Sequence, residues 1–170
     1  LRENLGFFGY ASYLSELIDI LFDLNDPYPN VFGLLCDSFE LLPRYSPSLI
    51  LRAFEAKLFE TVGLLPIFDH CVLCRKEYID QCFFSSRQGG IICPSCDQHE
   101  PGTIKISRGA IQSVLYFLKT DIRQAVRLSL SQQTEKELEL IHFRFLQYRL
   151  EYPLRTTKFL AEIKPLVYKL

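Results

Sequence analysis

Residues 71–96 read CVLCRKEYIDQCFFSSRQGGIICPSC and hold five cysteines, four of which form two pairs. Cys71 and Cys74 form the first pair, Cys93 and Cys96 form the second, and eighteen residues separate the pairs. Two thiolates spaced in this way can face one ion when the backbone makes a tight turn. Two such turns complete a tetrahedron of soft sulfur ligands, which Zn²⁺ prefers. The stretch therefore predicts a structural zinc site.

The segment between the two pairs has the composition of a β-hairpin. Phe83 and Phe84 favour a strand, residues 85–90 have turn chemistry, and Ile91 and Ile92 lead back to the second pair. Glycines 89 and 90 can adopt positive φ where the chain reverses. A hairpin with a metal at its base is a zinc ribbon.

Other interpretations of the cysteines differ in chemistry. Disulfides are disfavoured because a C-x2-C ring is strained and the composition is typical of a cytosolic protein. Iron in a rubredoxin-like site would use the same four ligands, and a catalytic zinc would keep one position open. His70 and His99 flank the two pairs and are alternative ligands, whereas Cys36 and Cys82 are expected to be buried packing residues.

Helical periodicity fills the rest of the chain, with apolar residues recurring every three or four positions. Asn30 and Ser46 are expected N-caps, Pro47 suits a first helical position, and Thr134 with Glu137 forms a capping box. Gly63 is expected to end the third helix. The predicted helices cover residues 4–24, 30–42, 46–62, 107–118, 121–128, 134–152 and 157–164.

The predicted fold is mainly α: a helical bundle with an inserted four-cysteine zinc ribbon that contains a small β-hairpin. We expect residues 1–66 to form the first part of the bundle, 67–102 the ribbon and 103–170 the second part. The chain contains no methionine and begins at Leu1, so we expect an N-terminal part to be missing.

Composition excludes several classes of protein. The chain is 48% apolar, which is typical of a globular domain, and it has no apolar run long enough for a membrane span and no secretory signal. Phosphate-binding loops, dinucleotide fingerprints and nucleophile elbows are absent from the sequence, and no set of carboxylates suggests a catalytic pocket. We therefore predict a binding module and no enzyme.

Charge is divided unevenly along the chain. Residues 1–102 carry 7 Lys and Arg against 14 Asp and Glu, whereas residues 103–170 carry 12 against 6. Basic side chains of the last third, near Tyr148 and Tyr152, could follow a nucleic-acid backbone and offer stacking surfaces. Ordinary solvated helix faces would give the same pattern. The candidate DNA-binding residues are Arg123, Arg127, Arg144, Arg149, Arg155 and Lys158.

Five segments, in this order and spacing, resemble the C-terminal region of the RecO family of bacterial recombination mediators. They are Arg52–Leu58, Val62–Pro66, Cys71–Cys74, Gly89–Cys96 and Leu154–Leu160. The resemblance covers most of the chain. In the family, glycine often occupies the position after the first cysteine pair, where this chain has Arg75.

The resemblance implies an N-terminal OB barrel, absent from this chain, followed by a helical bundle that bears the ribbon. It implies a cytoplasmic, non-catalytic protein of the bacterial nucleoid that acts in DNA repair, binds single- and double-stranded DNA, anneals strands and assists RecA loading. RecR and the acidic C-terminal tail of the single-stranded DNA-binding protein are the implied partners. Arg52, Phe54 and Lys57 are candidates for binding that tail. The alternative is a zinc-ribbon protein–protein adaptor without a nucleic-acid role.

Overall fold

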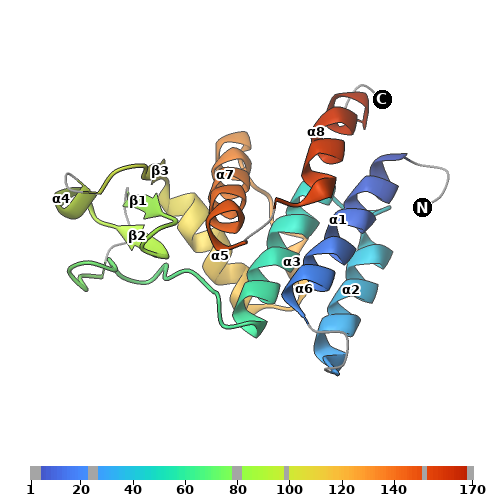
Figure 1. The fold of residues 1–170 in the computed structure, drawn as a ribbon, viewed down its shortest axis with the longest axis horizontal. Helices are drawn as coiled ribbons and strands as arrows, with labels where there is room; N and C mark the ends of the chain where they lie inside the picture. Colours follow the sequence, from blue (N-terminus) through green and yellow to red (C-terminus); the bar gives the residue numbers. More distant parts are fainter. Residues whose placement is uncertain (1–4, 23–26, 78–81, 98–99, 151–152, 168–170) are drawn as a thin grey trace.

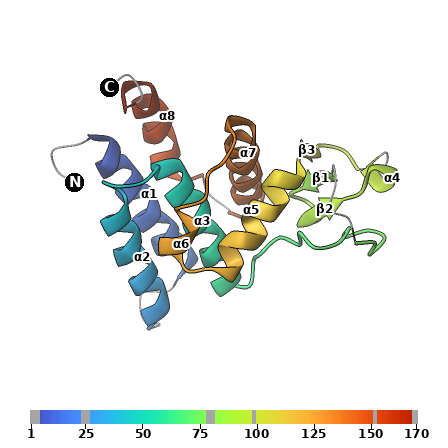
Figure 2. The same ribbon diagram turned by 180° about the vertical axis from the view of Figure 1, so that it is seen from behind.

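A computed structural model of the protein describes residues 5–22, 27–77, 82–97, 100–150 and 153–167, with side chains up to residue 162. Three helices come first: α1 (Leu5–Leu21), α2 (Pro29–Leu41) and α3 (Pro47–Thr61). They pack against one another at one end of the molecule (Figures 1 and 2). The three predicted N-terminal helices are therefore present, and residues 23–26, around the expected end of the first at residue 24, lie outside the described residues.

Helix α3 is the central element of the bundle. Ten of its fifteen residues are buried, and it contacts α1, α2, α5 (Arg108–Lys119), α6 (Ile122–Ala125) and α7 (Gln132–Arg149). The last helix, α8 (Arg155–Val167), returns to pack along α1 (Figure 1). Glu16 of α1 caps α8, because its carboxylate accepts hydrogen bonds from the backbone amides of Arg155 (2.7 Å) and Thr156 (2.9 Å).

A small antiparallel sheet lies at the opposite end of the molecule from α1 and α2 (Figures 1 and 2). Its strand order is β2–β1–β3, with β1 at Cys82–Ser85, β2 at Gly90–Ile92 and β3 at Ile104–Ile106. Phe84 pairs with Ile91 on one side and with Ile104 on the other. The predicted hairpin is confirmed, and β3 is an addition that lies beyond the expected ribbon boundary at residue 102.

The sheet packs on the helical bundle through aromatic side chains. The Phe84 ring, which is fully buried, stacks on Phe68 at 5.8 Å and meets the edge of Phe145 of α7 at 6.3 Å between centroids. Ile91 and Ile106 join the same core cluster as the helices. A second, smaller cluster surrounds Cys71 and Cys93. One face of the ribbon therefore belongs to the main core, and the division into three domains stays a prediction.

Two of the predicted helix caps differ from those in the structure. Helix α2 begins at Pro29, after Tyr28, so Asn30 already lies within the first turn. Helix α7 begins at Gln132 because Ser131 is its cap and accepts a hydrogen bond from the amide of Thr134 at 3.1 Å. Glu137 therefore forms no capping box. Its carboxylate instead accepts from the amide (2.9 Å) and hydroxyl (2.5 Å) of Ser107, the cap of α5.

The hairpin needs glycine for two reasons. Gly89 has a φ of +70°, and Gly90 lies so close to the incoming chain that an added Cβ would stand 2.7 Å from the carbonyl oxygen of Ile67. This close approach lets the segment before the first cysteine pair run beside β2, where Ile91 donates to the Ile67 carbonyl at 2.9 Å. In the described part of the chain, no helix combines the length and apolarity needed to cross a bilayer.

Candidate metal centre and basic groove

The four predicted cysteines gather in space. The Sγ atoms of Cys71, Cys74, Cys93 and Cys96 all lie within 4.8 Å of one another, and those of Cys74 and Cys93 are 3.7 Å apart. Sulfurs at about 2.3 Å from a tetrahedral metal ion would be about 3.8 Å apart. None of the four forms a disulfide. The four cysteines therefore lie close enough to bind one metal ion, and their predicted clustering is confirmed.

Each cysteine pair sits on a tight turn. In the first, the amide of Arg75 donates to the Cys71 carbonyl at 2.9 Å, and in the second, the amide of Cys96 donates to the Cys93 carbonyl at 3.0 Å. The short helix α4 (Pro94–Asp97) follows Cys93. The turns are held together by a bond from the Val72 amide to the Ile91 carbonyl (2.9 Å), so the hairpin sets the distance between the two pairs.

Hydrogen bonds shift the pKa values of the cysteine thiols. The Ser95 hydroxyl lies 3.1 Å from Cys93 Sγ and is the main reason that the pKa of Cys93 is lowered to about 6. Burial alone would raise the pKa of Cys71, but backbone amides, led by that of Cys93, outweigh burial and lower it. For Cys96, the hydrogen bond with Cys93 raises the pKa to about 12. A divalent cation at the centre would favour the thiolate at all four positions.

The other cysteines, and the one described histidine beside the first pair, lie outside this group of four sulfurs. Cys82 is buried on β1, as predicted, whereas Cys36 is exposed on α2, so its expected packing role is wrong. His70 Nδ1 lies 2.7 Å from an Asp69 carboxylate oxygen, outside the group of four sulfurs. His99 lies outside the described residues.

Arg75 adopts the left-handed backbone region, with a φ of +63°. A side chain there costs free energy, whereas glycine adopts the same φ readily. This geometry explains why glycine suits the position. His70 and Arg75, together with Asp69 and Glu77, also line a cleft of about 420 Å³ against α5.

A second hollow lies between the hairpin turn, residues 85–90, and α7. This basic groove has a volume of about 290 Å³. Arg87 and Arg144 face it from opposite sides, and Tyr148, which is 54% exposed, offers a ring surface. The groove is lined by Ser85, Ser86, Arg87, Pro101, Gly102, Arg144, Gln147 and Tyr148.

Arg149 braces the edge of the basic groove. Its guanidinium carbon lies 5.2 Å from the Phe145 ring centroid and 5.9 Å from that of Tyr148. One of its terminal nitrogens lies so close to Gly89 that a Cβ there would stand 2.8 Å away. Arg149 therefore joins α7 to the hairpin turn, and two of the six predicted DNA-binding residues, Arg144 and Arg149, come together at this place.

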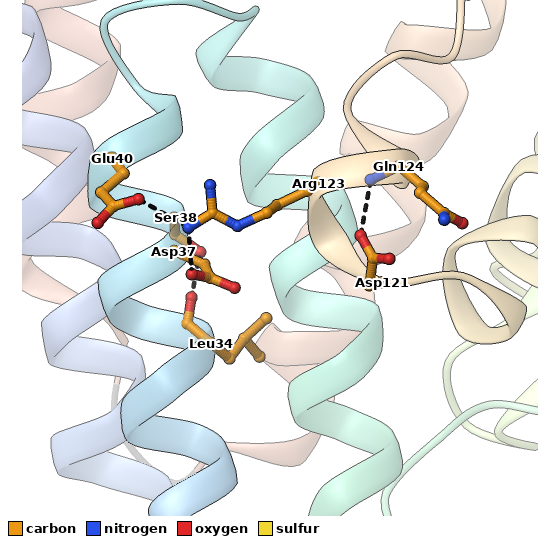
Figure 3. Close-up of polar contacts among 7 residues, drawn as sticks. All are labelled: Leu34, Asp37, Ser38, Glu40, Asp121, Arg123 and Gln124. Carbon is orange, nitrogen blue, oxygen red and sulfur yellow. Dashed lines mark hydrogen bonds and ion pairs between the residues drawn. The ribbon is translucent and has the colours of Figure 1, made fainter.

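Arg123 is engaged elsewhere, in a contact between α6 and α2 (Figure 3). One of its terminal nitrogens lies 2.6 Å from an Asp37 oxygen and 2.7 Å from a Glu40 oxygen. Its expected role in DNA binding is therefore not supported, because two carboxylates already offset its charge. The chain could not reveal this pairing locally, since the partners are more than eighty residues away.

The other predicted basic residues lie away from the basic groove. Arg127 is exposed after α6, a helix that packs on α2 and α3. Arg155 and Lys158 are exposed on α8, which packs along α1. The six residues therefore do not form one continuous surface. Tyr152, expected near them, lies outside the described residues.

The three side chains expected to bind a partner tail face inward or are engaged. Phe54 is fully buried, and Arg52 is 7% exposed with a guanidinium nitrogen 3.0 Å from the Glu55 carboxylate. Lys57 donates its ammonium group to the Thr120 carbonyl and so ties α3 to the end of α5. Burial of Arg52 and Phe54 contradicts their role as a docking surface. Sequence periodicity did not reveal this burial, because neighbouring helices cover α3 on both its apolar and its polar face.

Glu55 is the centre of a buried tetrad with Tyr13, Arg52 and His142. The Tyr13 hydroxyl donates to one oxygen of Glu55, and His142 Nδ1 lies 2.5 Å from the other. Burial opposes ionisation of Glu55, but the charge of Arg52 and the bond from His142 lower its pKa. Burial lowers the pKa of His142 and raises that of Tyr13. His142 is only 3% exposed, so it is a core residue of α7.

Comparison with known proteins now identifies the family. The family model described as "Recombination protein O C terminal" matches residues 2–158. The chain belongs to the RecO C-terminal family. It is 32% identical over 164 residues to a DNA repair protein RecO of Desulforamulus reducens, covering 96% of this chain and 64% of that protein.

Two further relatives carry the same name. The chain is 30% identical over 160 residues to the DNA repair protein RecO of Pelotomaculum thermopropionicum, covering 94% of the chain and 62% of the relative. The chain is 32% identical over 169 residues to the DNA repair protein RecO of Symbiobacterium thermophilum, covering 96% of the chain and 67% of the relative. The chain thus spans less than two thirds of the first two relatives. The resemblance inferred from the five sequence segments is confirmed.

Some features of this RecO C-terminal chain escaped sequence reasoning. Arg87 lies within the turn of the ribbon and was read only as turn chemistry, yet it faces Arg144 across the basic groove. Glu100 was not singled out from the sequence, although it is buried and accepts a hydrogen bond from Ser85, which lines that groove. A signal was available for Arg87, since a cation at the tip of a hairpin must lie at the surface.

Proposed function

We propose that this chain is a non-catalytic, zinc-stabilised binding domain of a cytoplasmic recombination mediator that acts in DNA repair. Family membership supports the repair role, since the relatives named above are DNA repair proteins. The cysteine-only donor set supports Zn²⁺ over harder cations, and the four sulfurs lie close enough to share one ion. A full set of four sulfurs leaves no open coordination position, which favours a structural role for the metal.

The observation that carries the nucleic-acid role is the basic groove. Arg87 and Arg144 can neutralise phosphate oxygens, and the exposed Tyr148 ring can stack on a base. Cation contacts with the Phe145 and Tyr148 rings hold Arg149 at the same edge. We propose that single-stranded DNA binds here, and that duplex DNA uses the same cations with less stacking.

The proposed partners follow from the family. They are RecR, the C-terminal tail of the single-stranded DNA-binding protein and, indirectly, RecA, whose loading and strand annealing the mediator would assist. Because Arg52 and Phe54 are buried, the tail would bind through other residues of the domain.

Binding to a fluorescently labelled oligothymidine, measured by anisotropy at several salt concentrations, tests the proposal. Replacing Arg144 with Gln should reduce the slope of log affinity against log salt by about 0.7, the value for one phosphate contact of a single strand. Tyr148→Ala should weaken binding by about 1–3 kcal/mol, typical of one lost stacking contact. The matched control is Arg123→Gln, which should leave affinity unchanged because Arg123 pairs with Asp37 and Glu40.

A protein–protein adaptor is the second candidate function. Large apolar side chains are exposed on the first two helices, including Phe8 (55%) and Phe32 (69%). An adaptor would lose its partner on Phe32→Ser and would be insensitive to changes in the basic groove. Absence of oligothymidine binding at low salt, combined with that loss, would replace the nucleic-acid proposal.

A further inference from the structure

Glu100 is a buried carboxylate directly beneath the hairpin turn. It is 8% exposed, and its two oxygens accept hydrogen bonds at 3.1 Å from the Ser85 hydroxyl and from the Gln88 side-chain amide. Both donors belong to the hairpin turn that carries Arg87. These bonds fix the carboxylate, and with it a negative charge, next to a groove whose other charged side chains are arginines.

Arg87 lies at the edge of this carboxylate without being fixed by it. Its Nε lies 3.6 Å from Glu100 Oε1, and its side chain is 61% exposed while that of Glu100 is 5% exposed. An ion pair with one partner so exposed is weak and is readily exchanged. Because Ser85 and Gln88 already satisfy the Glu100 oxygens, Arg87 can leave without stranding a buried carboxylate.

We propose that Glu100 sets the affinity of the basic groove by competing with nucleic-acid phosphate for Arg87. This inference rests on the proposed function. In the free protein Arg87 pairs with Glu100, and on binding it turns toward a phosphate oxygen. The carboxylate remains in place, so binding has to break the Arg87–Glu100 pair, and the groove binds less tightly than its arginines alone would dictate.

The distinguishing substitution is Glu100→Gln. The glutamine carbonyl can still accept from Ser85, and its amide can pair with Gln88 after that side chain flips, so the turn keeps its hydrogen bonds. Removing the charge should tighten oligothymidine binding about two- to fivefold at low salt, the range typical of an exposed ion pair. Because Arg87 contacts phosphate in both proteins, the slope of log affinity against log salt should change by less than the value of about 0.7 for one phosphate contact.

Two comparisons separate this effect from a general change of charge. Asp19→Asn makes the same change in net charge on an exposed position of α1, at the other end of the molecule, and should leave binding unchanged. In an Arg87→Gln background, Glu100→Gln should give no gain, because the competed cation is gone. An equal gain in Asp19→Asn, or a persisting gain without Arg87, would overturn the proposal.

A second measurement does not depend on the folding of the Glu100 variant. Because Glu100 offsets its charge, Arg87→Gln should weaken binding at least about twofold less than Arg144→Gln does. Equal losses for the two arginines would overturn the inference while leaving the groove as a binding site. Absence of oligothymidine binding by the unaltered chain would instead overturn the proposed function together with this inference.

Discussion

The Glu55 carboxylate lies 2.5 Å from His142 Nδ1 and thereby joins α3 to α7 in the middle of the bundle. Both side chains are buried, and Arg52 and Tyr13 complete the coordination of the same carboxylate. Burial lowers the pKa of His142, so the imidazole is neutral at pH 7 and its Nδ1–H donates to Glu55. Two helices whose polar residues lie 87 positions apart in the sequence are thus joined through a charged centre.

Stability should fall on mild acidification. A histidine with a lowered pKa in the folded state stabilises the fold above its unfolded pKa of about 6.5, and this contribution is lost as the pH falls further. Glu55, whose pKa is also lowered, contributes a second loss below its usual pKa of about 4.5. The free energy of unfolding in urea, measured between pH 8 and pH 5, tests the histidine contribution, because this range spans the unfolded histidine pKa of about 6.5.

His142→Gln is the matched variant for this pH dependence. Glutamine can still donate to Glu55 but does not titrate, so the loss between neutral and mildly acidic pH should shrink. A bundle that becomes more stable on acidification, or a variant with unchanged pH dependence, would contradict the assignment of a neutral buried His142.

Glu55→Gln should destabilise the protein by about 3–5 kcal/mol, because it leaves the Arg52 guanidinium buried without a counter-charge. The Arg52 Nε already lacks a hydrogen-bond partner among the described residues, so the loss of Glu55 would leave the guanidinium still less satisfied. The exposed Glu60 of the same helix provides the control, and Glu60→Gln should change stability by less than about 0.5 kcal/mol. Similar urea midpoints for the two variants would refute a charged core.

Arg75→Gly should stabilise the ribbon by up to about 1 kcal/mol, because glycine accepts the left-handed φ at lower cost. Arg75→Ala keeps that backbone cost while removing the side chain, which lies 3.4 Å from His70. In thermal melts of the metal-loaded protein, Arg75→Gly should have a higher melting temperature than Arg75→Ala. If alanine matched glycine, the backbone of the first turn would not be strained.

Removal of the metal should unfold the ribbon first. Metal binding and local folding are coupled at such sites, so a chelator or Cys96→Ser should abolish the hairpin while much of the helical circular dichroism remains. The helical transition should also move to lower temperature, because Phe84 would no longer cover Phe145. A melting curve that is unchanged by the chelator would count against the coupling.

The sequence predicted what local patterns encode. Cysteine spacing located the metal site, and helical periodicity located α1, α3, α5 and α7 because their apolar stripes are long. Strand β3 escaped because three residues are too short to show alternation. The capping box at Thr134 was wrong because Ser131, three residues earlier, offered an equally suitable hydroxyl.

Long-range pairing accounts for the remaining differences. Whether Arg123 contacts phosphate or Asp37, and whether His142 faces solvent or Glu55, depends on residues more than eighty positions away. Similarly, Arg144 became part of a groove only through the hairpin turn, and Arg155 and Lys158 were separated from it by the packing of α8 on α1. No local pattern distinguishes these outcomes.

X-ray absorption at the zinc edge of the purified protein tests the central claim most directly. One zinc per chain, surrounded by four sulfurs at about 2.3 Å, is the expected result. A first shell containing nitrogen or oxygen, or a purified chain whose cysteines are joined as disulfides, would contradict a closed structural site that holds the ribbon on the helical bundle.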